Sequence, residues 1–187
     1  MSVPTFANNT LVTSVNGWIV IQQRVDGSQD FNLPWNDYKS GFGVFDKNFW
    51  LGLEKMHKLT TSADYRLRFE VLMASGWVSD EYDHFKVNSE LQMYSLVVFG
   101  YSGDNEDVLN SPYNALMIQN GMQFTTFDKD NDLAPTENCA AGSYGGNWYK
   151  NCYLINLNGV YGSSLYYFKV SKNVPVIYCR MMIKLNI

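Results

Sequence analysis

The sequence has no hydrophobic run of 18 or more residues, and it has few basic residues. A helix needs about 20 consecutive apolar residues to cross a bilayer, so no membrane-spanning helix is predicted. The first residues, MSVPTFANNTLVTSVNGW, lack the basic and apolar regions of a signal peptide. The 14 Lys and Arg are scattered and are outnumbered by 18 Asp and Glu, which gives a net charge of -4. Nucleic acids and anionic lipids attract clustered positive charge, so neither is predicted as a partner.

Catalytic motifs are also missing. The histidines, His57 and His84, have no Ser or Cys nucleophile near them in a motif such as G-x-S-x-G. No glycine-rich stretch has the strand–loop–helix setting and the lysine of a phosphate-binding loop. The sequence therefore does not predict an enzyme.

Cysteine is scarce, with 3 residues in the chain. Cys139 and Cys152 lie in a glycine-rich irregular stretch, where a disulfide would contribute roughly 3 kcal/mol by the chain-entropy model. Zinc binding is the alternative, but it needs two further ligands, and both histidines lie far from this stretch. Cys179 is left over. Asn8-Asn9-Thr10 is a glycosylation sequon, which agrees with an exported chain; the missing leader would then indicate a fragment or a truncated product.

Aromatic residues are abundant, because 13 Tyr, 11 Phe and 5 Trp make up 16% of the chain. Tyrosine and tryptophan favour half-buried strands and recognition surfaces, since each combines a broad apolar ring with a polar group. A chain of 187 residues is long enough to form one domain with its own core. Alternating apolar and polar residues predict strands at 17–25, 64–73, 82–87, 94–101 and 176–185.

One helix is predicted after the first strand. Phe49, Leu53 and Met56 follow helical spacing behind Asp46, which would cap the helix. Turns are predicted at 26–27 and 36–37, where Asp-Gly and Asn-Asp occur. Between about 103 and 165 the regular patterns fade, and Gly, Asn, Asp and Tyr dominate. A long irregular segment with many aromatic residues is typical of a functional region that a metal ion or a disulfide supports.

Acidic residues alternate within that segment at Asp128, Asp130 and Asp132. Ca2+ binds six to eight oxygen atoms, and carboxylates two residues apart in a turn can converge on one ion. A solvated acidic loop is the alternative interpretation of this spacing.

A series of motifs runs through the chain in a fixed order: NGWIVIQQRVDGSQDFNLPWNDYKSGFGVFDKNFWLGLEKMHKLT, FGYSGDN, the DKDND–NCA loop, NWYKNC and NLNGVYG. Together they resemble the fibrinogen C-terminal (fibrinogen-related) domain family, which includes ficolins, tachylectin-like lectins, angiopoietins, tenascins and fibrinogen. The resemblance covers roughly residues 16–187 and leaves 1–15 as an N-terminal lead-in. It implies an α+β fold, with an antiparallel sheet, short helices and an irregular calcium-binding lobe at about 103–165.

The resemblance also implies a calcium site in that lobe. Asp130 and Asp132 would supply side-chain ligands, and the backbone carbonyls of Ala134 and Thr136 would complete the shell around Ca2+. Asp128 would be a neighbour of the ion and not a ligand.

A ligand pocket is implied beside the calcium site. Cys139 and Cys152 would form its disulfide, and the peptide bond Asn151–Cys152 would be cis, which turns backbone N–H groups toward the ligand. Tyr144, Asn151, Cys152 and Tyr153 would line the pocket. Aromatic walls with backbone donors suit an acetamido group.

The leading functional prediction is a secreted, calcium-dependent recognition module that binds acetylated carbohydrates in the manner of ficolin-like lectins. One shallow pocket binds weakly, so useful avidity would need a homo-oligomer. The chain departs from the family pattern: it has no Cys before 139, a short segment after Asn158, and Tyr153 where His is common. Tyr153 favours the alternative, a protein-interaction module that binds a receptor or matrix protein and has a modified or lost sugar pocket.

Overall fold

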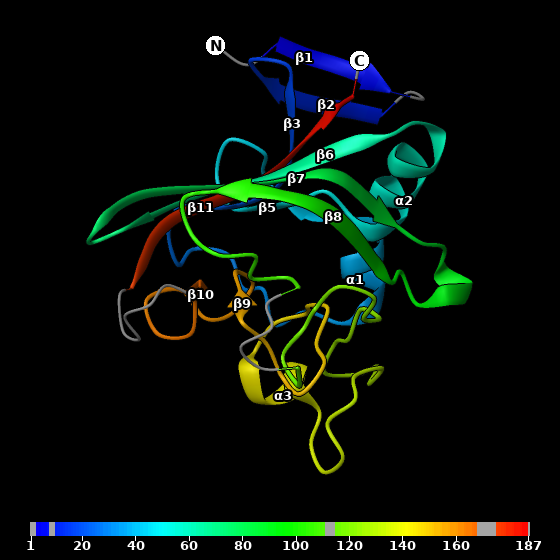
Figure 1. Cartoon of the computed structure of the whole chain (residues 1–187), viewed down its shortest axis with the longest axis vertical. Helices are drawn as coiled ribbons and strands as arrows, with labels where there is room; N and C mark the ends of the chain where they lie inside the picture. The colour runs from blue at the N-terminus through cyan, green and yellow to red at the C-terminus, as the bar shows by residue number, and fades with distance from the viewer. Residues whose placement is uncertain (1–2, 8–9, 111–114, 168–174, 187) are drawn as a thin grey trace.

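An antiparallel sheet organises this molecule, as the computed structural model shows (Figure 1). The structure describes residues 3–7, 10–110, 115–167 and 175–186. The strand order is β1-β2-β3-β11-β6-β7-β8, and β5 pairs with both β3 and β4 beside this path. The strands of this sheet are β1 (Val3–Ala7), β2 (Thr10–Val15), β3 (Trp18–Arg24), β4 (Phe42–Gly43), β5 (Phe49–Trp50), β6 (Tyr65–Met73), β7 (Gly76–Val87), β8 (Leu96–Gly103) and β11 (Val176–Leu185).

The predicted α+β class is confirmed, and each predicted strand overlaps a strand of this sheet. The alternation in β6 shows why. Tyr65, Leu67 and Phe69 are buried, whereas Arg66 and Arg68 between them are only partly buried. One face of the strand therefore packs on the core and the other meets solvent. The predicted strand at 82–87 is the end of the longer strand β7.

The described helices are short: α1 (Trp35–Ser40), α2 (Leu53–Ser62), α3 (Cys139–Ser143) and the 3-10 helix η1 (Glu90–Gln92). The predicted helix start at Asp46 is wrong, because Phe49 belongs to β5. Gly52 has a φ of 107°, which is outside the helical region, so a helix cannot run through it. The helix begins only at Leu53, and Leu53 and Met56 point into the core as predicted.

The predicted turn at 36–37 is also wrong, because these residues lie inside α1. Pro34 directly precedes this helix with a φ of -73°. Proline favours a helix start, since its fixed φ suits the first turn and its missing N–H is not needed there. At 26–27 the chain does bend, and the Asp26 carboxylate accepts a hydrogen bond from Ser28 N at 2.9 Å.

The described part of the first 15 residues belongs to the sheet. β1 and β2 pair with each other, and β2 continues the sheet by pairing Ser14 with Ile19 and Val15 with Trp18 of β3. None of the helices within the described residues has the length and apolar character that a membrane crossing requires.

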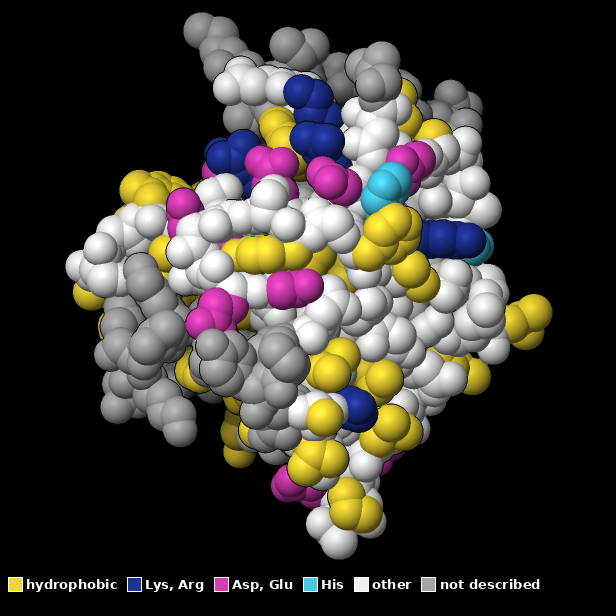
Figure 2. Space-filling model, viewed as in Figure 1, with side chains coloured by type: hydrophobic (Ala, Val, Ile, Leu, Met, Phe, Trp, Pro, Cys, Tyr) yellow, Lys and Arg dark blue, Asp and Glu magenta, His cyan; other side chains and the backbone are white. Residues whose placement is uncertain are grey.

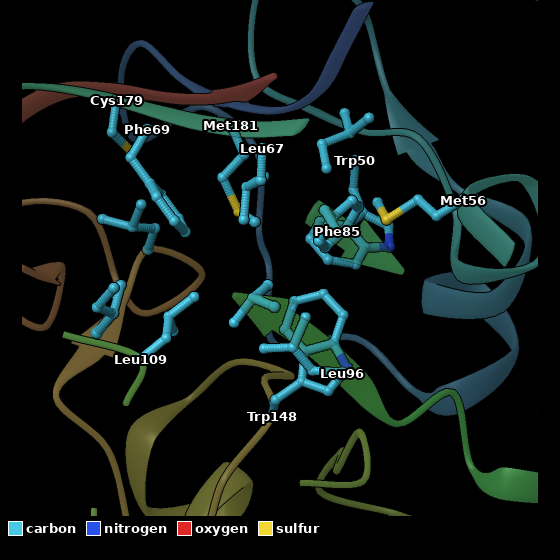
Figure 3. Packing of buried hydrophobic residues seen from close by; sticks show 14 of the residues in the cluster. Trp50, Met56, Leu67, Phe69, Phe85, Leu96, Leu109, Trp148, Cys179 and Met181 are labelled. Atoms are coloured by element: carbon cyan, nitrogen blue, oxygen red, sulfur yellow. The ribbon is translucent and has the colours of Figure 1, made fainter. Parts of the chain in front are cut away.

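The main core lies between the sheet and the elements on one of its sides. In Figure 1, α1 and the irregular segment lie below the sheet, and the irregular segment includes the small strand pair β9 (Ile155–Asn156) and β10 (Tyr166–Tyr167). Figure 3 shows Phe69 and Met181 extending from the sheet toward Leu109 and Trp148. The sheet and the irregular segment, which we call the lobe (103–167), therefore share one hydrophobic core.

Candidate recognition site in the lobe

Buried amide side chains organise the lobe where regular strands are few. Gln119 is 1% exposed, and its Oε1 accepts hydrogen bonds from the backbone N–H groups of Leu154 (3.2 Å) and Ile155 (2.8 Å). Its Nε2 donates to the carbonyl of Trp148 at 3.2 Å. Asn147 Nδ2 donates to the Ile155 carbonyl at 2.6 Å. Because buried backbone groups need hydrogen-bond partners, these side chains supply the hydrogen bonds that a neighbouring strand would supply in a sheet.

An arginine ties the lobe to the sheet. Arg24 on β3 is 1% exposed, and its Nη1 donates to the carbonyls of Gly159 (2.7 Å) and Leu157 (3.3 Å). Its guanidinium carbon lies 3.9 Å from the ring centre of Phe31. Burial lowers the pKa of this guanidinium from its ordinary value. Gln22 also donates to the Leu157 carbonyl, at 2.8 Å. Sequence patterns missed these residues, because polar side chains in a strand resemble a solvent-facing row.

The predicted disulfide between Cys139 and Cys152 is present, with an S–S distance of 2.07 Å. The disulfide excludes these two cysteines as zinc ligands. Both histidines also have other partners: His57 Nδ1 lies 2.9 Å from the Val87 carbonyl, and His84 Nδ1 lies 2.9 Å from Asp64. Around the bridge is a small second core, made of buried Cys139, Ala140 and Tyr149 with Ala134, Cys152 and Tyr153 packed against it. The bridge is thus the centre of its own packed cluster.

The predicted calcium residues lie in a tight loop beside that cluster. The Asp132 carboxylate accepts hydrogen bonds from Ala134 N through Oδ1 and from Cys139 N through Oδ2, both at 2.8 Å. Asp132 N donates to Asp130 Oδ1 at 3.3 Å. Burial, and to a smaller degree the charge of Asp130, raise the pKa of the Asp132 carboxyl.

This loop fits a hard divalent cation. A positive charge beside Asp130 and Asp132 would offset the repulsion between the two carboxylates, and Ca2+ prefers oxygen ligands. Among the described residues, the carbonyl oxygens of Ala134 and Thr136 accept no hydrogen bond, so both could serve as ligands. Asp128 is occupied elsewhere: it accepts hydrogen bonds from Trp35 N (2.9 Å) and Thr126 Oγ1 (2.7 Å).

Three of the predicted pocket residues are consecutive beside the bridge. The Asn151–Cys152 bond is cis, as the resemblance implied. The Tyr153 ring centre lies 5.6 Å from that of Tyr149 and 6.1 Å from that of Tyr166. Tyr144 ends α3 and is 55% exposed. Among the described aromatic rings, none contacts the ring of Tyr144, so it stands apart from this tyrosine cluster.

Exposed leucines adjoin the same backbone. Leu116 and Leu133 are 57% and 61% exposed. Asn151 N donates to the Leu116 carbonyl at 3.0 Å, and Leu133 N donates to the Lys150 carbonyl at 2.9 Å. Lys150 Nζ donates to the Ala115 carbonyl at 2.6 Å. We call Leu116, Leu133 and Lys150 the lobe patch. Figure 2 shows that hydrophobic side chains are exposed on the lower part of the molecule.

Sequence reasoning did not select either leucine. A single apolar residue in an irregular polar segment is usually an isolated surface residue, and only the backbone pairing places these two on either side of the same segment, 150–151. The remaining site prediction, glycosylation at Asn8, falls outside the described residues. Cys179 is free and buried in β11.

Known proteins resemble this chain over most of its length. Tenascin-R from Rattus norvegicus is 41% identical over 154 residues, which cover 82% of this chain and 11% of tenascin-R. Protein scabrous from Drosophila melanogaster is 38% identical over 175 residues, which cover 91% of this chain and 21% of scabrous. The chain therefore spans about a tenth of the length of the tenascin and about a fifth of scabrous.

Solved structures share the fold. The fibrinogen-like globe domain of human ANGPTL2 is 33% identical, with a TM-score of 0.86, and the match covers 100% of this chain and 92% of that domain. Lamprey fibrin D-dimer, complexed with the peptide ligand Gly-His-Arg-Pro-amide, is 29% identical with a TM-score of 0.80, covering 92% of this chain and 64% of that one. The sequence profile described as fibrinogen beta and gamma chains, C-terminal globular domain, matches residues 7–178. This chain belongs to the fibrinogen C-terminal globular domain family.

Proposed function

We propose that this domain is an extracellular recognition module, not an enzyme, and that it binds a protein partner through the lobe patch. The observation that carries this proposal is the pair of exposed leucines, which main-chain hydrogen bonds hold against 150–151. Apolar side chains on a fixed backbone supply binding energy at a low ordering cost. The patch would form the centre of an interface with a polar rim. A family member complexed with a peptide ligand supports the class of partner.

A protein partner fits this surface better than a small acetylated sugar does. The N–H of Asn151, one of the predicted pocket residues, donates to the Leu116 carbonyl at 3.0 Å and so is not available to a sugar. Leu116 and Leu133 offer apolar surface, which a protein side chain can cover and a sugar hydroxyl cannot.

Calcium is part of the same proposal. Asp130 and Asp132 with the carbonyls of Ala134 and Thr136 would hold the ion, and Leu133 lies between these ligands in the chain. A bound Ca2+ supplies positive charge that offsets the repulsion between the two carboxylates. The loop would then hold Leu133 in one position, which lowers the ordering cost of binding.

Acetylated glycans are the second candidate ligand. The observation in their favour is the contact of Tyr153 with Tyr149 and Tyr166 beside the disulfide, since an aromatic wall suits an acetamido methyl group. This candidate uses the tyrosine cluster and not the leucines. The two proposals therefore predict different sensitive residues.

The decisive experiment measures binding of the wild-type domain, with Ca2+ present, to a panel of purified extracellular protein domains and to N-acetylglucosamine. We expect a protein ligand whose affinity falls about tenfold or more in the double variant Leu116→Asp, Leu133→Asp. Leu91→Asp is the matched control, because Leu91 is 93% exposed and lies in η1, outside the lobe. An unchanged affinity in the double variant would overturn the protein proposal. Binding of N-acetylglucosamine that Tyr153→Ala abolishes would establish the second candidate.

A further inference from the structure

The solvent-facing side of the sheet has its own ordered rows of side chains. Cross-strand register places Tyr178 of β11 opposite Leu72 of β6, and Leu72 opposite Trp77 of β7. The next row in the same direction is Arg180, Glu70 and Ser79. A row with aromatic residues at both ends and a leucine between them thus lies directly beside a polar row on three neighbouring strands. Figure 2 shows acidic and basic side chains side by side on this face.

A groove of about 300 Å³ lies over these rows, and Trp77 forms one of its walls. Its lining residues are Arg68, Glu70, Trp77, Val78, Ser79, Asp104 and Arg180. Trp77 is 60% exposed, and its ring centre lies 5.7 Å from that of Tyr178 in an edge-to-face contact. The groove volume is at the lower end of the roughly 300–1,000 Å³ that small-ligand sites occupy. We call it the sheet groove.

The polar side chains of the sheet groove are held in fixed positions. Arg180 binds Glu70 Oε2 through Nε at 2.7 Å, and Arg68 Nε donates to Ser79 Oγ at 3.0 Å. The Asp104 carboxylate accepts a hydrogen bond from Ser79 N at 2.8 Å through Oδ2. A site on rigid strands with locked side chains needs little reorganisation to bind a ligand.

Unused hydrogen-bonding capacity remains in the groove. Among the hydrogen bonds and ion pairs of the described residues, Arg68 Nη2 and Asp104 Oδ1 have no partner. Arginine offers five donors and a carboxylate offers several acceptor sites, so each can serve a ligand while keeping its present bonds. The groove therefore presents donors and acceptors together beside an exposed indole ring.

We propose that the sheet groove binds a neutral saccharide. A sugar ring has an apolar face that can lie on Trp77, and its hydroxyl groups both donate and accept hydrogen bonds. The two arginines of the lining are balanced by Glu70 and Asp104, so the groove offers no net positive charge to an anionic ligand. An apolar peptide anchor would remove water from Arg68 Nη2 and Asp104 Oδ1 without giving either atom a partner, which is costly. This site is independent of the lobe patch and of the calcium loop.

The experiment measures binding of the full domain to an immobilised array of neutral, sialylated and sulfated glycans. We expect neutral glycans to bind, and Trp77→Ala to weaken that binding about tenfold or more. Loss of the edge-to-face contact with Tyr178 should lower the melting temperature by only about 2–5 °C, so the domain stays folded. Phe99→Ala is the matched control, because Phe99 is 55% exposed on the neighbouring strand β8 and does not line the groove. Tyr153→Ala tests the lobe and should also bind as the wild-type domain does.

Three results would overturn the proposal. The first is that the wild-type domain binds no neutral glycan, and the second is that it binds only sialylated or sulfated glycans. The third is neutral-glycan binding that Trp77→Ala leaves unchanged, whether or not Tyr153→Ala reduces it. None of these results bears on protein binding by the lobe patch, which the leucine variants test separately.

Discussion

At the scale of single residues, burial decides which reactive groups this domain can use. Cys179 has no exposed surface, and burial raises the pKa of its thiol to about 12. Because the thiolate is the nucleophilic form, a thiol of this kind is inert at neutral pH in the folded protein. Cys179 is therefore a core residue of β11, whereas Cys139 and Cys152 are joined in a disulfide.

Asp26 gives a residue-scale prediction about pH. Hydrogen bonds from the Ser28 hydroxyl, then from the Ser28 N–H and from Asn48 Nδ2, lower the pKa of its carboxyl from 3.8 to about 2. A carboxyl whose pKa is lowered by folding stabilises the protein above its unfolded pKa, and this contribution is lost as the pH falls toward 2. We expect an NMR titration of the Asp26 carboxyl to have its midpoint near 2.

The variant that tests this assignment is Ser28→Ala, which should move the Asp26 midpoint upward toward the ordinary value. Gln29→Ala is the control, because Gln29 bonds to the Asp30 carbonyl and not to Asp26. A midpoint that stays low in Ser28→Ala would show that the Ser28 hydroxyl is not the main cause.

At the scale of elements, the acidic loop is where a bound ion would act. Asp132 links the loop to the start of α3 through its hydrogen bond to Cys139 N, so an ion at Asp130 and Asp132 would stabilise both elements together. At a concentration about 100 times the dissociation constant, binding adds about 2.7 kcal/mol. For a domain of this size we expect Ca2+ to raise the melting temperature by about 5–10 °C.

Single substitutions in the loop distinguish the residues that bind Ca2+ from those that only lie near it. Asp130→Asn and Asp132→Asn should abolish most of the Ca2+ shift in melting temperature. Asp128→Asn is the matched control: it should lower the melting temperature with and without Ca2+, because Asp128 anchors Trp35 N, but it should keep the shift. A shift that survives in Asp132→Asn would place the ion elsewhere, and no shift in the wild-type protein would leave the loop as a solvated turn.

Local patterns predicted the elements unequally. The alternation from Tyr65 to Val71 was sufficient for β6, because half of that strand faces water and half faces the core. The predicted helix start was wrong because the backbone conformation of Gly52 excludes a helix. The spacing of apolar residues contains no information about that conformation. Within the site, the disulfide and the acidic loop could be found from the motifs. The lobe patch could not, because its leucines are placed on either side of segment 150–151 only by hydrogen bonds to the backbone of that segment.

Across the whole molecule, the polar residues that were hardest to predict join the parts together. Gln22 and Arg24 of β3 bind backbone carbonyls of the lobe, and Phe69 and Met181 share a core with Trp148. A sequence pattern describes one segment at a time, whereas the hydrogen bonds of Gln22 and Arg24 join residues more than 100 positions apart. The sheet and the lobe should therefore unfold as one cooperative unit.

Arg24→Met tests this coupling at the scale of the whole molecule. The substitution keeps an apolar stem over Phe31 but removes the donors to Leu157 and Gly159. It leaves the buried Gly159 carbonyl unpaired, whereas the Leu157 carbonyl keeps the hydrogen bond from Gln22. We expect a loss of about 2–4 kcal/mol in the free energy of unfolding, which lowers the melting temperature by roughly 5–15 °C. Arg66→Met is the control, because Arg66 forms partly exposed ion pairs with Glu81 and Asp83 and should cost under about 1 kcal/mol.

Hydrogen exchange then shows how the loss is distributed. If Arg24 joins two parts of one cooperative unit, Arg24→Met should accelerate exchange in β6 and in residues 155–159 by similar factors, because both exchange through global unfolding. Faster exchange in 155–159 alone, with β6 unchanged, would contradict this and show that the lobe opens independently of the sheet. In that case a partner bound at the lobe patch would stabilise the lobe without stabilising the sheet, since ligand binding protects only the unit whose opening it opposes.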